Sequence, residues 1–139
     1  MRAPPRIELV ELSTLKPHEH LRPARLHQVY YSIRRTRTLY KPLIADAQTL
    51  LLIDGHHRLK SLALLGVRRA PVLLVDYERD IRSVRVRTPL FSLKPEYTSL
   101  TGAGERMRLL DRLVRLPLLP AKSTIHETWA KRVVLRYRL

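Results

Sequence analysis

The stretch Leu51-Leu52-Ile53-Asp54-Gly55-His56-His57-Arg58-Leu59-Lys60-Ser61-Leu62-Ala63-Leu64-Leu65-Gly66 decides the fold. It begins with a short apolar run, which predicts a buried strand that ends at Ile53. Helical spacing then relates four apolar residues: Leu59, Leu62, Ala63 and Leu65. We therefore expect a helix from His57 to Leu65 that stops at Gly66, so that the chain passes from a strand through a turn at Gly55 into a helix.

Such a turn has the chemistry of a phosphate site. The first N–H groups of a helix have no intrahelical partner, and the helix dipole is positive there. Gly55 lets a ligand approach the backbone, and His56, His57 and Arg58 add further donors. Asp54 fits a different role, because a carboxylate beside bound phosphate holds Mg²⁺ or orients an attacking hydroxyl. The alternative is that Asp54 only caps the helix and the histidines are ordinary surface residues.

The rest of the pattern predicts an α+β fold in one domain over residues 1–139. We expect strands at 7–12, 71–75, 84–87 and 132–139, and a hairpin formed by 42–45 and 49–53. Apolar residues at helical spacing predict helices at 26–33 and 107–114. Residues 13–23 and 89–104, which contain prolines, are expected to be loops.

Composition narrows the function classes. The chain has 27 Lys and Arg against 12 Asp and Glu, a net charge of +15, which favours polyanionic partners such as nucleic acid, nucleotides or phosphorylated small molecules. No cysteine is present, which excludes disulfides and thiolate metal sites. No apolar run is long enough for a membrane span, and the N-terminus lacks a secretory signal, so we expect a cytoplasmic protein. The absence of Asn fits a heat-adapted host.

The stretch from Leu51 to Gly66 resembles the core of the ParB/sulfiredoxin-like superfamily. Its Asp-Gly-His-His-Arg turn is most similar to that of the free serine kinases of this fold. The resemblance implies a mixed sheet with flanking helices and a turn that grips nucleotide phosphates. It also implies phosphorylation of free L-serine by ATP or ADP with Mg²⁺, giving O-phosphoserine, and a place in cysteine biosynthesis.

Two further segments resemble the serine kinases. In Leu15 to His20, Glu19 matches their catalytic base, although the residue types alone also fit a solvated loop. Pro120 to His126 resembles the segment that lines their serine site. The resemblance therefore assigns substrate binding to Lys122, Ser123, Thr124 and His126, within a C-terminal part, residues 117–139, that contributes to the substrate site. A lysine, hydroxyls and an imidazole close together suit a carboxylate or phosphate.

One departure concerns the acceptor. The kinases place a tryptophan in the strand that corresponds to residues 84–88, whereas Trp129 lies elsewhere in this chain. An acceptor with more negative charge would suit Arg85 or Arg87. Two other functions stay open: a ParB-like partition protein that binds DNA, favoured by the net charge, and a ParB-like nuclease with a metal between Glu19 and Asp54. The sequence leaves ATP or ADP, and the oligomeric state, undecided.

Overall fold

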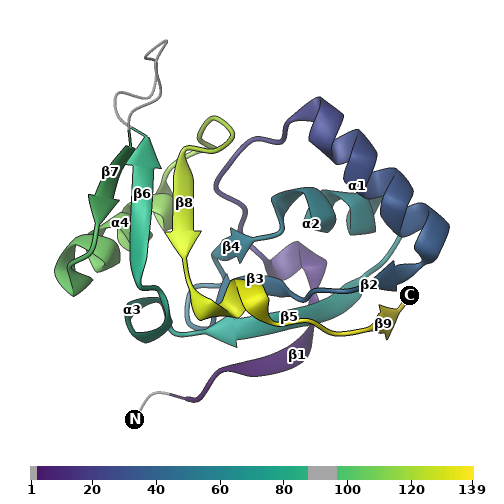
Figure 1. Ribbon diagram of the computed structural model, residues 1–139, viewed down its shortest axis with the longest axis horizontal. Coiled ribbons are helices and arrows are strands. Elements are labelled where there is room, and N and C mark those ends of the chain that lie inside the picture. The colour runs from purple at the N-terminus through teal and green to yellow at the C-terminus, as the bar shows by residue number, and fades with distance from the viewer. Residues whose placement is uncertain (1–2, 88–96) are drawn as a thin grey trace.

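The computed structural model describes residues 3–87 and 97–139 (Figure 1). The strands are β1 (Arg6–Glu11), β2 (Thr38–Leu39), β3 (Leu43–Asp46), β4 (Leu52–Asp54), β5 (Arg69–Val75), β6 (Ser83–Arg87), β7 (Tyr97–Leu100), β8 (Thr124–Glu127) and β9 (Tyr137–Arg138). The α-helices are α1 (Pro23–Thr36), α2 (His56–Leu64), α3 (Tyr77–Asp80) and α4 (Ala103–Arg115), and short 3-10 helices occupy Leu12–Thr14 (η1) and Trp129–Arg132 (η2).

A four-stranded mixed sheet lies at the centre, in the order β1-β5-β3-β4. β3 runs parallel to β5, and the other two pairs are antiparallel. Successive residues of a strand point to opposite faces, so Val72 and Val75 of β5 belong to two different hydrophobic clusters. One cluster includes Ile33 of α1 and Leu62 of α2, and the other includes Leu113 of α4. The predicted α+β class and mixed sheet with flanking helices are confirmed.

The limits of α2 follow from two glycines with positive φ. Gly55 has φ 105°, and a Cβ there would lie 2.6 Å from Leu43 Cδ2. Gly66 has φ 78°, with its N–H donating to Ala63 and the next N–H, of Val67, donating to Leu62. This pair of bonds is a Schellman motif, which ends the helix where the sequence predicts.

Two predictions about the C-terminal half need correction. Residues 97–100, expected to be loop, form β7, which pairs with β6; residues 88–96 of that expected loop lie outside the described residues. Residues 124–127 form β8 on the other side of β6. The expected strand 132–139 is reduced to β9, which pairs with β2 alone. These strands have only two to four residues each, and their partners are distant in sequence, so local alternation carries little signal for them.

None of the helices in residues 3–87 and 97–139 combines the length and the apolar composition that crossing a membrane requires.

Candidate active site

The turn between β4 and α2 has the predicted form. Asp54 ends the strand, Gly55 is the N-cap, and no side chain caps α2. The interpretation of Asp54 as a helix cap is therefore wrong, and the first N–H groups of α2 stay available to a ligand. The helix has nine residues, so its dipole adds positive potential at this end.

Arg58 is already engaged within the protein. Its Nη1 donates to the carbonyl oxygens of Lys41 and Pro42 at 3.0 and 2.9 Å, and its Nη2 lies 3.1 Å from Asp54 Oδ2. The guanidinium thus braces the turn against the segment that leads into β3. A contact between Arg58 and phosphate stays a prediction, and it would require some of these bonds to be exchanged.

The two histidines of the turn hold a loop of the N-terminal half. His56 Nε2 accepts a hydrogen bond from the backbone N–H of His18 at 3.2 Å, and His57 Nε2 accepts one from Arg22 N–H at 3.0 Å. Burial lowers the pKa of His56 to about 3 and also lowers the pKa of His57. Both rings are therefore neutral, with the proton on Nδ1, and they position the loop that carries Glu19.

Glu19 sits where this loop meets the C-terminal segment. Its Oε1 accepts a hydrogen bond from Thr124 N–H at 3.1 Å, and its side chain is only 12% exposed. The backbone of Leu119 bonds to the residues on either side of Glu19, which fixes the two segments together. Burial raises the pKa of Glu19, and the hydrogen bond from Thr124 and the charge of Lys131 oppose this shift. A carboxylate with a raised pKa is a better proton acceptor than an ordinary glutamate.

The four residues that we predict to bind the acceptor differ in their positions: Lys122, Thr124 and His126 line the cleft described below, and Ser123 does not. Lys122 is exposed, has φ 60° and lines the cleft described below. Ser123 is fully buried and donates to Pro120 O at 2.6 Å, so it is turned away from that cleft. Thr124 and His126 follow on one face of β8, and Thr124 Oγ1 lies 2.9 Å from His18 Nε2. The turn in this segment is confined to residues 121–122.

His126 has a partner that no local sequence signal indicates. Its Nε2 lies 2.7 Å from the hydroxyl of Tyr77, a residue that is 1% exposed. This hydroxyl has no other hydrogen-bond partner among the described residues. Burial raises the pKa of Tyr77 well above its ordinary value, so the hydroxyl keeps its proton. Because a buried hydroxyl must donate, it donates to Nε2. Burial also lowers the pKa of His126, so the ring is neutral and its own proton is on Nδ1.

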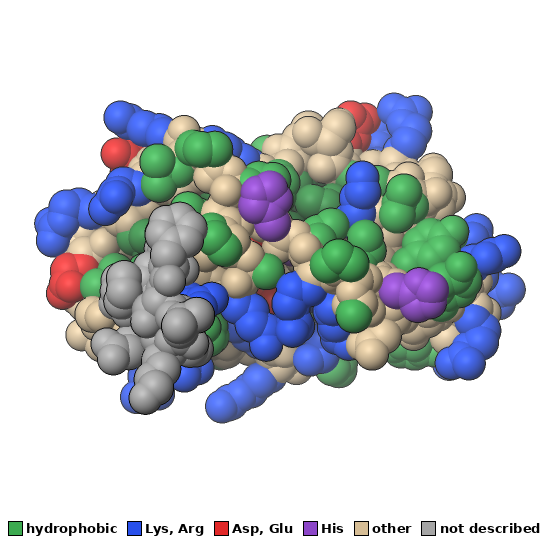
Figure 2. Space-filling view, turned by 90° about the horizontal axis from the view of Figure 1, so that it is seen from above, with side chains coloured by type: hydrophobic (Ala, Val, Ile, Leu, Met, Phe, Trp, Pro, Cys, Tyr) green, Lys and Arg blue, Asp and Glu red, His purple; other side chains and the backbone are tan. Residues whose placement is uncertain are grey.

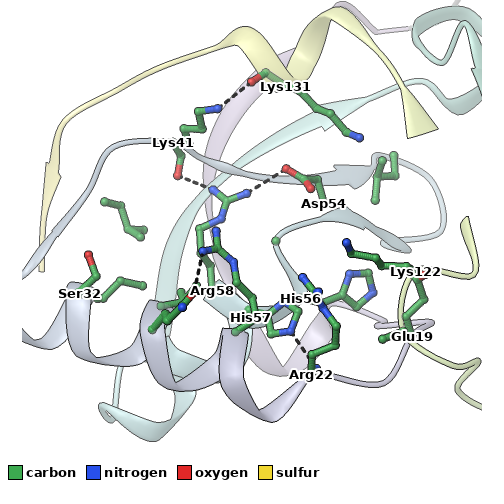
Figure 3. Close-up of a pocket in the computed structure, with 18 of the residues that line it drawn as sticks. Glu19, Arg22, Ser32, Lys41, Asp54, His56, His57, Arg58, Lys122 and Lys131 are labelled. Carbon is green, nitrogen blue, oxygen red and sulfur yellow. Dashed lines mark hydrogen bonds and ion pairs between the residues drawn. The ribbon is translucent and has the colours of Figure 1, made fainter. Parts of the chain in front are cut away.

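These residues converge on one cleft of about 820 Å³ (Figure 3). Glu19, Asp54 and His126 line it together with the start of α2. Residues that the sequence did not single out also line it: Arg22, Arg25, Gln28, Ser32, Tyr40, Lys41 and Lys131. Figure 3 shows Lys122 and Lys131 reaching into the cleft from the C-terminal segments. Cations outnumber carboxylates in the lining, which makes the cleft suited to an anionic ligand.

Arg85 and Arg87 do not line this cleft. Arg85 lies on β6, paired with Ile125 of β8, and its Nε is 3.5 Å from Glu127 Oε1. Trp129 is also outside the cleft lining. That an acceptor with more negative charge would suit Arg85 or Arg87 stays a prediction, and this cleft does not support it, because neither residue is in its lining.

Two sets of groups could hold a cation. Asp54 Oδ2 is paired with Arg58, but Oδ1 has no hydrogen-bond partner in residues 3–87 and 97–139. A single carboxylate together with phosphate oxygens is the usual way in which Mg²⁺ binds beside a nucleotide, so Asp54 fits this ion. His18, Glu19 and His56 bring ligand atoms within 4.8 Å of one another, but a set with two imidazoles suits zinc-like metals rather than Mg²⁺.

Comparisons with known proteins agree with the resemblance. No family model matches the chain. An ADP-dependent L-serine kinase from Thermococcus kodakarensis is 34% identical over 86 residues, which are 59% of this chain and 36% of that protein. A ParB-like protein from Sulfolobus acidocaldarius is 28% identical over 79 residues, 57% of this chain and 39% of that protein. A solved free serine kinase in complex with AMP superposes with a TM-score of 0.60 at 17% identity, covering 88% of this chain and 87% of that chain.

The matched segments span little more than a third of the length of these two curated relatives. Within the matched segments, the chain is similar in sequence both to an L-serine kinase and to a ParB-like protein. Its structural likeness to the solved free serine kinase extends over 88% of the chain. The resemblance indicated by the Asp-Gly-His-His-Arg turn is confirmed: the chain has the fold of the free serine kinases and is a relative of the L-serine kinases and of ParB-like proteins.

Proposed function

We propose that the protein is a small-molecule kinase that transfers a phosphoryl group from ATP or ADP to the hydroxyl of free L-serine, giving O-phosphoserine. One observation carries this proposal. Glu19, a buried carboxylate whose pKa is raised, and Asp54, a carboxylate with one free oxygen, line the same cleft as the uncapped start of α2. The cleft therefore combines a proton acceptor, a ligand for a cation and an anion site.

The nucleotide phosphates dock at the start of α2. The N–H groups of residues 56–58 bind the phosphate oxygens, and Gly55 permits the approach because no Cβ stands in the way. Arg22, Arg25 and Lys41 line the cleft on the side of α1 and β2 and add positive potential. Residues 1–139 then act as one nucleotide-binding domain, to which the segment 117–139 contributes the acceptor side.

Asp54 would hold Mg²⁺ through its free Oδ1, and the ion would help to offset the charge that develops on the leaving nucleotide. The acceptor lies between Asp54 and the turn at residues 121–122. Lys122 binds its carboxylate, and His126 Nδ1 donates a hydrogen bond to it or to the transferred group. Thr124 has an indirect part, because its N–H orients Glu19 and its hydroxyl is occupied by His18.

The chemical step balances with these groups. The serine hydroxyl oxygen forms a bond to the terminal phosphorus while the bond from that phosphorus to the leaving nucleotide oxygen breaks. Glu19 takes the hydroxyl proton, and ATP leaves as ADP, or ADP as AMP. Catalysis is then mainly positioning and stabilisation of charge, which is the general pattern of phosphoryl transfer.

The test is incubation of the purified protein with L-serine, Mg²⁺ and either ATP or ADP, followed by ³¹P NMR. We expect an O-phosphoserine signal with at least one donor, and loss of that signal in Glu19→Gln. Consumption of nucleotide without a phosphoserine signal would reject serine as the acceptor. No transfer from either donor to serine, under conditions in which the protein is folded, would reject the proposed reaction.

A further inference from the structure

The positive charge of the chain is concentrated in two segments. Residues 20–45 and 128–139 together contain ten Lys and Arg and no Asp or Glu, whereas the remaining sequence contains 17 Lys and Arg and all 12 acidic residues. The two segments lie side by side although they are about ninety residues apart, because β2 pairs with β9 (Figure 1). Most of the net charge of +15 is therefore collected on one region of the molecule.

Six of these cations lie outside the cleft. Apart from Arg132 of η2, they are Arg34, Arg35, Arg37, Arg136 and Arg138, which we name the arginine face. All five are exposed, and none has an ion pair with any acidic residue that the structure describes. Figure 2 shows several Lys and Arg side chains at the right-hand end of the molecule, and others at the left-hand end and across the middle. Arg34, Arg35 and the C-cap residue Arg37 also offset the negative end of the α1 dipole, but Arg136 and Arg138 are not at a helix end, so this role does not explain the whole group.

Aromatic rings lie along α1 beside this face. The ring of Tyr31 is 48% exposed, with the ring of His27 at 4.5 Å and that of Tyr30 at 5.2 Å. The guanidinium of Arg34 lies 5.9 Å from the centre of the Tyr31 ring. Exposed rings with unpaired arginines are the combination that binds unpaired bases by stacking and their phosphates by charge.

We propose that the arginine face, with Tyr31, binds a single strand of nucleic acid. Phosphates contact the arginines, and a base stacks on Tyr31. A double helix would use the charges but not the ring, because its bases are already stacked. This surface is separate from the cleft, so the inference does not depend on the proposed kinase reaction.

The first test measures fluorescence anisotropy of a labelled oligothymidylate of 20 nucleotides over a range of salt concentrations. The variant Arg34→Ala/Arg35→Ala/Arg138→Ala is compared with Arg108→Ala/Arg112→Ala/Arg115→Ala, which removes the same charge from exposed positions on α4. Figure 1 shows α4 and β9 at opposite ends of the molecule. Exposed charges separated by more than the Debye length, about 10 Å at 0.1 M salt, are largely screened from one another. Circular dichroism and thermal unfolding confirm that each variant is folded.

We expect the variant of the arginine face to bind about tenfold or more weakly, with the slope of log affinity against log salt reduced by about 2, because three phosphate contacts are lost. The α4 variant should stay within about threefold of the parent, since its charges are screened from the bound strand. Equal losses in both variants would show a response to net charge alone and would overturn the proposal. Absence of binding by the parent at about 0.1 M salt would also overturn it.

A second test isolates stacking. Tyr31→Ala should weaken binding of the oligothymidylate by about tenfold or more, while Tyr31→Phe should bind like the parent, because both rings offer a face to a base. A duplex of the same length should bind more weakly than the single strand and should not respond to Tyr31→Ala. If the duplex binds as tightly as the single strand, or if Tyr31→Ala has no effect on single-strand binding, the assignment of this face to single strands is wrong.

Discussion

Replacing Arg58 with alanine distinguishes a structural role in the turn from a direct role in binding phosphate. The guanidinium has three partners: the carbonyl oxygens of Lys41 and Pro42 and the carboxylate of Asp54. Lys41 is exposed, so water can replace the lost donor there. Asp54 is 39% exposed at its side chain, so its ion pair contributes about 0–1 kcal/mol. Pro42 is buried, and its carbonyl loses a charged donor, which costs about 1.5–3 kcal/mol.

We therefore expect Arg58→Ala to lower the free energy of unfolding by about 2–4 kcal/mol, with the loss at Pro42 as the main part. Urea unfolding followed by circular dichroism measures it. Arg25→Ala is the matched control, because Arg25 lines the same cleft and carries the same charge but is exposed, with Gln28 as its hydrogen-bond partner at 3.4 Å. The control should change the free energy of unfolding by less than about 0.5 kcal/mol.

Nucleotide affinity, measured by calorimetry on the same variants, completes the test. If backbone N–H groups dock the phosphates, folded Arg58→Ala should keep most of its affinity. If instead the free energy of unfolding is unchanged and nucleotide binding weakens by about 1.5–3 kcal/mol, the guanidinium leaves its three partners to bind phosphate, and the bracing role is refuted. Arg58→Lys should be intermediate in stability, because one ammonium cannot reach both the carbonyls and Asp54.

Three further predictions concern the same cleft. Glu19→Gln should lower kcat by about 10²–10⁴ with little change in nucleotide affinity, and a kcat within a few-fold of the parent would contradict the role of base. In the parent, activity should appear as pH rises through the raised pKa of Glu19, so the acid limb of the kcat/KM profile should lie above the range of an ordinary glutamate. Tyr77→Phe should mix the tautomers of His126, seen in ¹⁵N NMR shifts, and raise the acceptor KM by about tenfold; an unchanged Nδ1–H signal would show that Tyr77 does not set the tautomer. Gly55→Ala should lower the free energy of unfolding by at least about 1–3 kcal/mol through backbone strain, and the contact with Leu43 adds to the loss; thermal unfolding that matches the parent would refute this.

The strand, turn and helix around Gly55 could be predicted because their signals are local. A buried apolar run, a glycine and a helical repeat follow one another within sixteen residues, and the structure places Asp54 and α2 as expected. The positions of Glu19 and Lys122 near this turn came from the resemblance, not from any local pattern. Their convergence depends on backbone bonds between Leu119 and the residues on either side of Glu19, one hundred positions earlier, and single-sequence patterns contain no information about such pairing.

Other features of the site could not be predicted for the same reason. Tyr77 contacts His126 across 49 residues, and in the sequence it is only one aromatic residue at the start of a short helix. Lys131 reaches the cleft from η2, just before the segment 132–139 that we expect to be a strand. The resemblance assigns Ser123 to the substrate site because it stands inside the matching motif, yet the turn before β8 points its hydroxyl into the protein. A motif therefore predicts which segment lines a site, whereas strand register decides which of its side chains do so.

The buried imidazoles and Glu19 form one electrostatic arrangement. His56 fixes the loop of Glu19 by accepting a hydrogen bond from His18 N–H, which is possible only while its ring is neutral. Burial lowers the pKa of His56 to about 3, and the same burial raises the pKa of Glu19. The two shifts move in opposite directions because each disfavours the charged form of its group. Whenever Glu19 is ionised and able to accept a proton, His56 is therefore neutral and holds the loop in place, so the cleft is assembled throughout the pH range in which its base is active.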